Sequence, residues 1–292
     1  MKKNNKKNSN TKISEKKKQF DNSNLKEITK SIRKNIIIML NKAKSGHTGG
    51  SLGMTDVFSV LYFKILKNIH NLKIEDRDRF ILSNGHICPV WYATLAEKGF
   101  IKKEELLTLR QINSRLQGHP VNHDFEFAEV STGSLGQGIS VAVGLALSYK
   151  RDKKKSKIYV SMGDGELQEG SVWESFMFAS HYKLNNLIVF IDRNFVQQSG
   201  KTEEMLSLEP LNKKFEAFGF NVIESDGHNL NEIEKAFIEA SKNSEKNEKP
   251  NVIIFKTTMG KGVSFIENNY EWHGKAPNDD EMKKALEEIE KL

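Results

Sequence analysis

The sequence KIYVSMGDG at residues 157–165 decides the fold. Its first six residues form a short apolar run that is typical of a buried parallel strand and too short for a core helix. A second run of this kind, NLIVFID at residues 186–192, ends just before Asn194. Residues 166–183, between the two runs, repeat apolar side chains at helical spacing. This pattern predicts a β-α-β unit with Asp164 and Asn194 at the carboxyl ends of two parallel strands, where open α/β sheets bind ligands.

The side chains at these two strand ends suit a hard cation beside a phosphate group. Asp164 offers a carboxylate and Asn194 offers an amide oxygen, which are ligands for Mg²⁺ or Ca²⁺ rather than for zinc. Gly163 and Gly165 let the backbone come close to a diphosphate without an intervening side chain. Taken alone, Gly-Asp-Gly also fits an ordinary strand-to-helix turn with an aspartate N-cap. The glycine spacing excludes both a P-loop and a dinucleotide-binding fingerprint.

The longer string GDGELQEGSVWE at residues 163–174 resembles the transketolase family. A Gly-Asp-Gly motif with an asparagine thirty positions after its aspartate is similar to the thiamine-diphosphate motif. The resemblance extends from about residue 24 to the C-terminus. It implies an α/β fold over residues 21–292, with a mostly parallel central sheet and helices on both faces, which is the thiamine-diphosphate-binding (PP-type) domain. Because full transketolases are more than twice as long, the chain resembles the N-terminal subunit of a split transketolase.

The resemblance also implies a cofactor site on this chain. Thiamine diphosphate would be held through Mg²⁺, for which Ca²⁺ or Mn²⁺ could substitute. The implied metal ligands are Asp164, Asn194 and the backbone carbonyl of Val196. The backbone of Gly133 and Leu135, in the glycine-rich segment STGSLGQG at residues 131–138, would contact the pyrimidine ring of the cofactor.

Four histidines are candidates for ligand binding, two from their sequence context and two from the resemblance alone. His47 belongs to GHTGGSLGM at residues 46–54, where the density of glycines predicts a loop that passes close to a ligand. His86 comes directly after a predicted strand, and a histidine there lies where parallel sheets bind ligands. By resemblance, His86 meets the cofactor diphosphate, while a cluster over the thiazolium ring binds sugar hydroxyls and moves protons. The implied members of this cluster are His47, His119 and His273, and His273 also contacts the cofactor.

Two acids follow the Gly-Asp-Gly motif. Glu166 and Glu169 both fit exposed acids in the first turn of a helix, where the helix dipole favours negative charge. By resemblance, Glu169 has a further role, because it would hydrogen-bond the catalytic carboxylate supplied by the neighbouring polypeptide. Two further histidines are assigned no catalytic role: His123 is expected on the surface and His228 in a structural turn.

The composition excludes some classes of protein. No apolar run approaches the eighteen residues that a membrane-spanning helix needs, so no membrane contact is expected. The single cysteine, Cys88, cannot form an intramolecular disulfide or a cysteine zinc site, and we expect it in the core of a cytoplasmic protein.

The net charge of +7 has a local origin. Residues 1–20 contain eight lysines and one acid, a balance of 8 − 1 = +7, so the remaining 272 residues sum to zero. We expect this Lys/Asn-rich tail to be disordered, and we expect no nucleic-acid partner. Attachment of the tail to RNA or to an anionic surface, or a targeting role, is the alternative.

The predicted activity is transfer of a two-carbon ketol (glycolaldehyde) unit from a ketose phosphate to an aldose phosphate, a reaction of the pentose phosphate pathway. In this family, the glutamate that activates the cofactor lies in the pyrimidine-binding domain, which this chain lacks. The groups that hold the sugar phosphate would be missing for the same reason. We therefore expect the chain to act only with a C-terminal transketolase subunit, in an α₂β₂ assembly.

Three alternatives remain open. The chain could belong to another thiamine-diphosphate enzyme, such as a deoxyxylulose-phosphate synthase or a thiamine-dependent dehydrogenase subunit, although the four histidines favour transketolase. It could be a non-catalytic binding or regulatory module, which the presence of both Asp164 and Asn194 disfavours. It could also bind nucleic acid through its tail.

Overall fold

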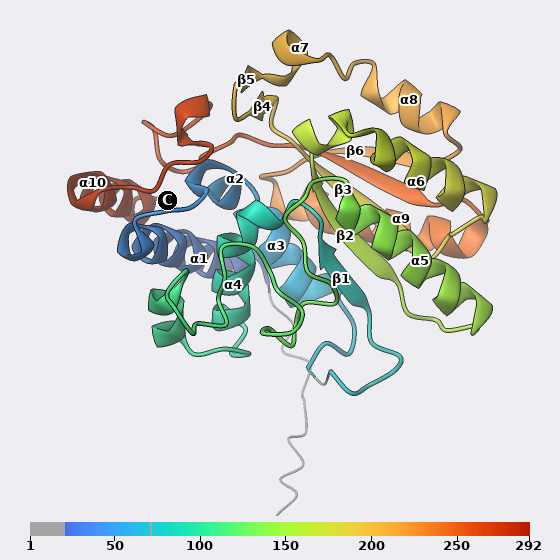
Figure 1. Cartoon of the computed structure of the whole chain (residues 1–292), viewed down its shortest axis with the longest axis horizontal. Coiled ribbons are helices and arrows are strands. Elements are labelled where there is room, and N and C mark those ends of the chain that lie inside the picture. The colour runs from blue at the N-terminus through green and yellow to red at the C-terminus, as the bar shows by residue number, and fades with distance from the viewer. Residues whose placement is uncertain (1–20, 71) are drawn as a thin grey trace, which may run out of the picture.

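A five-stranded, fully parallel sheet forms the centre of the computed structural model, which describes residues 21–70 and 72–292 (Figure 1). The prediction of a disordered tail at residues 1–20 lies outside the described residues. The predicted α/β class with a parallel sheet is confirmed. In spatial order the strands are β1 (Arg79–Leu82), β2 (Ile158–Gly163), β3 (Leu187–Arg193), β7 (Asn251–Lys256) and β6 (Asn221–Asp226).

Alternating side chains of the central strands pack into two separate cores, because successive residues of a strand point to opposite faces of the sheet. On β3, Val189 packs into one core and Phe190 into the other. On β7, Val252 and Ile253 divide in the same way. A strand that is buried on both faces needs a continuous apolar run, which explains the runs that identify β2 and β3 in the sequence.

Helices cover both faces of the sheet, as predicted. The core on one face contains buried side chains from three helices, and α5 and α6 lie side by side along it (Figure 1). These helices are α5 (Gln137–Arg151), α6 (Gly170–His181) and α8 (Leu211–Ala217). The core on the other face contains side chains from α1 (Asn22–Ala43), α3 (Thr55–Val60), α4 (Cys88–Glu97), α9 (Leu230–Lys246) and α10 (Asp279–Glu290).

Short elements connect these layers. Five of them are short helical segments of 3₁₀ or π type: η1 (Leu61–Ile65), η2 (Gly85–Ile87), η3 (Lys103–Thr108), η4 (Gly165–Gln168) and η5 (Tyr270–Trp272). The remainder are α2 (Thr48–Gly53), α7 (Thr202–Met205) and a two-stranded hairpin of β4 (Val196–Gln197) and β5 (Gly200–Lys201).

The β-α-β unit forms as predicted, but its helix starts later than expected. The segment after the Gly-Asp-Gly motif is the 3₁₀ turn η4, and α6 begins only at Gly170. The two helical pieces are separate because Glu169 has extended backbone angles, with φ −77° and ψ 131°. Strands β2 and β3 pair directly, and the amide of Asp164 donates to the carbonyl oxygen of Asp192 over 3.2 Å.

The prediction of a loop at residues 46–54 was wrong, because most of this segment is the helix α2. Its glycines serve close packing rather than a loop. A Cβ added at Gly49 would lie 2.7 Å from Cγ of Met259, and one added at Gly50 would lie 2.8 Å from Cγ2 of Ile87. The helix can therefore press against both neighbouring segments and carry His47 at its N-terminus.

Within the two described ranges, no helix has the length and apolar character needed to cross a membrane.

Two helical glycines should respond in opposite directions to substitution with alanine. Gly49→Ala should lower the free energy of unfolding by about 1–3 kcal/mol, because its Cβ would overlap Met259 and would lie 3.1 Å from the carbonyl oxygen of Trp272. Gly144→Ala, on α5, has no atom within 4 Å of the added Cβ and should raise the free energy by about 0.5–1 kcal/mol. Urea unfolding measures the change in the free energy of unfolding for each variant. Equal changes for Gly49→Ala and Gly144→Ala would contradict the packing assigned to α2.

Candidate active site

The side chain of Asp164 is buried at the carboxyl end of β2, with 2% of its surface exposed. Its Oδ1 accepts the amide hydrogen of Gly165 over 2.8 Å. Its Oδ2 accepts hydrogen bonds from the amide of Phe195 over 2.8 Å and from Nη1 of Arg193 over 3.1 Å. A carboxylate oxygen can take two such partners, so Oδ1 keeps one free acceptor position for a cation.

The amide of Asn194 is fixed at the end of the next strand. Its Nδ2 donates to Oδ2 of Asp192, and its Oδ1 accepts the amide hydrogen of Val196, both over 2.9 Å. Asp192 is held in turn by the hydroxyl of Thr257, which donates to its Oδ1. The oxygen of Asn194 therefore also keeps a free acceptor position, at the sheet edge that carries Asp164.

The electrostatics of this edge suit a bound cation. Burial raises the pKa of Asp164 to about 6, against the opposing effect of Arg193, and burial raises the pKa of Asp192 to about 7. Carboxyl groups in a low-dielectric site ionise readily only when a positive charge compensates them. The described residues hold no group of three or more His, Cys, Asp or Glu side chains arranged for a metal. The donor set is instead oxygen-rich with a single carboxylate, which fits a hard cation that shares a phosphate.

Glu166 is buried, and the prediction of an exposed first-turn acid is wrong for this residue. Its Oε1 accepts from the hydroxyl of Ser83 and, over 2.9 Å, from the amide of Gly136. Its Oε2 accepts from the amide of Gly163 over 3.2 Å. Burial raises the pKa of this carboxyl to about 7. One side chain thus joins the end of β1, the glycine-rich loop and the Gly-Asp-Gly motif.

The glycine-rich loop lies against two of the predicted histidine segments. A Cβ added at Gly133 would lie 3.4 Å from the ring of His119, and one added at Gly85 would lie 2.6 Å from Oγ1 of Thr132. Leu135, in the same loop, is half-buried. The loop therefore carries the backbone of Gly133 past the histidines, where a ligand ring could contact it.

The four predicted histidines come together from four distant segments. The ring centroid of His47 lies 5.0 Å from that of His86, 5.6 Å from that of His273 and 6.4 Å from that of His119. The rings of His86 and His273 are 5.3 Å apart. This histidine cluster, defined as His47, His86, His119 and His273, lies beside the glycine-rich loop.

The histidine cluster is neutral near pH 7. Burial lowers the pKa of His47 to about 4, and the charges of His273, Arg110 and His119 act in the same direction. Burial also lowers the pKa of His86, His119 and His273. A neutral imidazole offers one donor and one acceptor, so the cluster can bind hydroxyl groups and pass protons.

Several buried polar atoms near the cluster have no hydrogen-bond partner in the part of the chain that the structure describes. They are Nδ1 of His47, both amide atoms of Asn84 and the hydroxyl of Thr132. Buried polar groups are nearly always hydrogen-bonded, so these atoms mark a place where a polar ligand would bind. Asn84 follows β1 and faces the motif, since a Cβ added at Gly163 would lie 3.9 Å from its Nδ2. No role was predicted for Asn84, although its position at the carboxyl end of a strand is one at which parallel sheets bind ligands.

The remaining predicted residues lie as follows. Val196 is in β4, two residues after Asn194, and its amide donates to Oδ1 of that residue. Glu169 is exposed, and its side chain makes no hydrogen bond or ion pair within residues 21–70 and 72–292. His123 is exposed, as expected. His228 is structural, as expected, because its ring joins Oδ2 of Asp56 over 2.9 Å and accepts the amide hydrogen of Thr258 over 2.8 Å.

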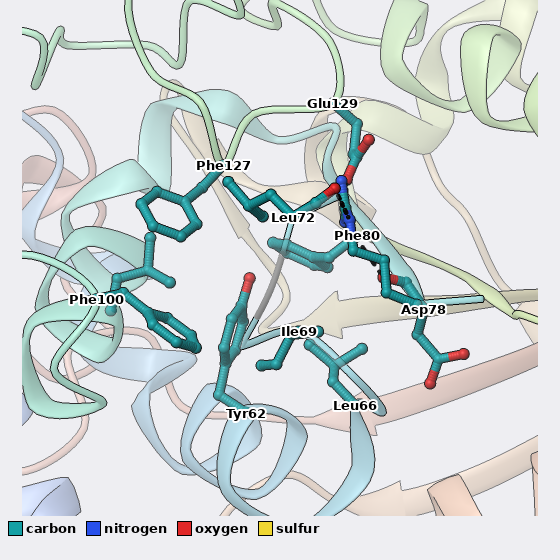
Figure 2. A pocket seen from close by; sticks show the side chains of 11 residues that line it. Tyr62, Leu66, Ile69, Leu72, Asp78, Phe80, Phe100, Phe127 and Glu129 are labelled. Carbon is teal, nitrogen blue, oxygen red and sulfur yellow. Dashed lines mark hydrogen bonds and ion pairs between the residues drawn. The ribbon is translucent and has the colours of Figure 1, made fainter. Parts of the chain in front are cut away.

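A small cavity at the other end of the sheet is a poor candidate for a ligand site (Figure 2). It measures about 20 Å³ and lies beside Asp78, directly before β1. Its polar groups are already paired: Glu129 contacts Arg77 and Arg79, and Asp78 accepts the amide hydrogens of Lys67 and Lys157. Parallel sheets bind ligands at the carboxyl ends of their strands, which this cavity does not reach.

The fold and the site define the class of protein, which is an α/β cofactor-binding domain. Residues 24–289 match the family model described as "Transketolase, thiamine diphosphate binding domain". An apulose-4-phosphate transketolase subunit from Actinobacillus succinogenes is 43% identical, over 91% of this chain and 95% of that one. The 6-deoxy-6-sulfo-D-fructose transketolase subunit SqwG of a Clostridium species is 41% identical, over 89% of this chain and 94% of that one.

Among solved structures, transketolase from Campylobacter jejuni superposes with a TM-score of 0.84 at 35% identity, over 91% of this chain and 42% of that one. The chain therefore belongs to the transketolase family and comprises its thiamine-diphosphate-binding domain. It spans nearly the full length of the relatives named as subunits and less than half of the single-chain transketolase.

Replacement of the Glu166 carboxylate should destabilise the protein. Glu166→Gln places an amide donor where Ser83, Gly136 or Gly163 also donates, so at least one buried donor loses its partner. We expect the free energy of unfolding to fall by about 1–3 kcal/mol. The matched variant Glu169→Gln, at an exposed side chain, should change it by less than about 0.5 kcal/mol. Chemical denaturation measures the free energy of unfolding of both variants. An unchanged value for Glu166→Gln would contradict the role assigned to this carboxylate.

The histidine cluster should make stability depend on pH. The pKa of His47 falls from 6.5 to about 4 on folding, so between these values the unfolded chain binds more protons than the folded chain. The free energy of unfolding should therefore fall as the pH decreases from 6.5 to 4, and the stability should be complete above 6.5. Denaturation at several pH values should show a shallower decline for His47→Gln than for the wild type. The exposed-site control His123→Gln should follow the wild type, and identical slopes for all three proteins would refute the prediction.

Proposed function

We propose that this chain is the diphosphate-binding subunit of a two-chain transketolase, which transfers a two-carbon ketol unit from a ketose phosphate to an aldose phosphate. The observation that carries the proposal is the placement of the Asp164–Asn194 edge and the histidine cluster around the same glycine-rich loop. Thiamine diphosphate, when bound, supplies a carbanion carrier for the two-carbon unit. Relatives of similar length that are named as transketolase subunits support the two-chain arrangement.

The cation site would be occupied by Mg²⁺, with Ca²⁺ or Mn²⁺ as substitutes. Its ligands would be the free acceptor positions on Asp164 and Asn194, together with the carbonyl of Val196. The cation offsets the negative charge of the diphosphate, which Gly163 and Gly165 allow to approach the backbone. This donor set is supported by the burial of Asp164, which raises the pKa of its carboxyl to about 6 even though Arg193 is bound to it.

The histidine cluster would bind the sugar and exchange protons with it. His47, His119 and His273 are neutral near pH 7, so each can hydrogen-bond a hydroxyl group and accept a proton from it. Burial lowers the pKa of His86 well below its usual value, and by resemblance this residue would hold the cofactor rather than the sugar. Gly133 and Leu135 would present backbone groups to the pyrimidine ring of the cofactor.

A partner subunit would complete the site. The outward faces of α5 and α6 and the residue that follows α6 expose large apolar side chains: Val141 (46%), Met177 (63%), Phe178 (39%) and Tyr182 (40%). The rings of Phe178 and Tyr182 lie 4.4 Å apart, and exposed apolar side chains that gather in this way are typical of interfaces. Glu169 is the N-cap residue of α6 and has no partner for its side chain among the described residues, so it can hydrogen-bond a carboxyl group of the other subunit when one of the two acids carries a proton. We propose an α₂β₂ assembly, and the single, buried Cys88 supports a cytoplasmic enzyme.

The proposal is tested by transfer activity in a mixture of subunits. The chain is assayed alone and together with its C-terminal transketolase subunit, with xylulose 5-phosphate, ribose 5-phosphate, thiamine diphosphate and Mg²⁺. We expect transfer only in the mixture, and we expect chelation of the metal to abolish it. Full activity of the isolated chain would refute the two-chain arrangement. An inactive mixture that still binds the cofactor would indicate that the enzyme acts on substrates other than these two sugars.

A matched pair of variants separates the role of Glu169 from folding. Glu169→Gln should reduce transfer in the mixture by about 10-fold or more while the unfolding transition stays in place, because its proposed partner lies on the other subunit. Glu174→Gln, further along α6 and also exposed, serves as the control for a change of surface charge. Equal transfer rates for the two variants would contradict the role assigned to Glu169.

A further inference from the structure

Asn84 carries a buried side-chain amide whose hydrogen bonds the fold leaves unused. The residue is 1% exposed, and neither Nδ2 nor Oδ1 has a hydrogen-bond partner within residues 21–70 and 72–292. In the unfolded chain both atoms bond to water, so burying them without partners is destabilising. A polar group that is enclosed in this way at a strand end is suited to a ligand that supplies the missing partner.

The backbone around this amide is held firmly. The amide of Ser83 donates to the carbonyl oxygen of Ser161 over 2.9 Å, and the carbonyl oxygen of Asn84 accepts the amide hydrogen of Ile87 over 3.1 Å. Asn84 is also the N-cap residue of η2, a position at which asparagine side chains commonly accept from the backbone. Its side chain makes no such capping bond. The fold therefore fixes the position of Asn84 while its amide takes no part in holding it.

The amide of Asn84 lies level with the Gly-Asp-Gly motif. The parallel register pairs Leu82 with Ser161, so two residues further along Asn84 comes beside Gly163. A Cβ added at Gly163 would lie 3.9 Å from both Cβ and Nδ2 of Asn84. Because β2 lies between β1 and β3, Asn84 and Asn194 follow the strands on opposite sides of the motif.

A diphosphate beside the motif would need neutral donors as well as a cation. The guanidinium of Arg193 is already engaged by three acids: Asp164, Glu203 and Glu209. A cation held by Asp164 and Asn194 takes only some of the diphosphate oxygens, and the others need hydrogen-bond donors. An asparagine amide has two donor hydrogens, and hydrogen bonds to a charged oxygen are stronger than those between neutral groups. Since no partner fixes the amide of Asn84, its NH₂ group can turn to the anion.

We propose that Asn84 is a further cofactor-binding residue, whose amide donates to a diphosphate oxygen that the cation does not take. This inference rests on the proposed function. It adds a donor from the end of β1 to His86, which the resemblance places at the same diphosphate. The amide gains its partner only when the anion binds, so Asn84 lowers the stability of the empty site and raises its affinity for the cofactor.

Calorimetric titration of thiamine diphosphate with Mg²⁺ into the chain mixed with its partner subunit tests this contact. Asn84→Ala should weaken binding by at least about 10-fold, because a hydrogen bond to a charged group is lost. Asn84→Asp should weaken it further, because a carboxylate repels the diphosphate. Asn251→Ala, at a buried asparagine that begins β7 at the opposite end of the sheet, should bind like the wild type.

Two outcomes of this titration would overturn the inference. Equal affinity of Asn84→Ala and the wild type would show that the amide bonds to water only. Tighter binding by Asn84→Asp than by Asn84→Ala would show that the ligand presents a donor or a cation to this position. Binding is read independently of sugar transfer: weakened binding in Asn84→Ala supports the inference even if the mixture transfers no ketol unit. Unchanged binding in an active mixture overturns the inference and leaves the proposed function standing.

Stability of the chain without cofactor separates ligand binding from a structural role. Asn84→Ala removes an unpartnered amide, so its urea midpoint should equal or exceed that of the wild type. Asn251→Ala should lower the midpoint, because the amide of Asn251 donates to Oγ of Ser244 over 3.2 Å and accepts from Asn221 over 3.1 Å. A midpoint that falls as far in Asn84→Ala as in Asn251→Ala would overturn the inference, because Asn84 would then stabilise the fold itself.

Discussion

The geometry of the site depends on one buried carboxylate, that of Glu166. It accepts from Ser83, Gly136 and Gly163, which belong to three segments that are far apart in the sequence. Each donor lies next to a binding group: Ser83 near His86, Gly136 in the glycine-rich loop, and Gly163 beside Asp164. A buried acceptor that satisfies three donors at once fixes their relative positions more firmly than loop packing alone. The cation edge and the histidine cluster are thereby held in a single arrangement.

Close backbone packing brings the histidines to the segments that Glu166 holds together. The glycines of α2 allow the helix that follows His47 to press against Met259 and Ile87. The resulting burial removes water from the rings, which keeps the imidazoles neutral near pH 7. Burial therefore links the fold to the chemistry, since the residues that pack around the cluster also determine the proton state of its rings.

The β-α-β unit and the strand-end positions of Asp164 and Asn194 could be predicted from the sequence, because apolar period and strand ends are local signals, whereas His119 and His273 were expected only from the family resemblance. The helical state of α2 could not, because glycine locally favours a loop and only tertiary contacts show that it serves close packing. The burial of Glu166 was missed for the same reason: Ser83, one of its partners, is 83 positions away in the sequence.

The central claim is that the Asp164–Asn194 edge holds a cation that carries the cofactor diphosphate. Calorimetric titration of thiamine diphosphate into the chain mixed with its partner subunit, with and without Mg²⁺, tests this claim most directly. We predict that binding requires the metal and that Asp164→Ala weakens it by at least about 100-fold, whereas removal of the exposed His123 leaves it unchanged. Equal affinity without Mg²⁺, or full affinity in Asp164→Ala, would contradict the account.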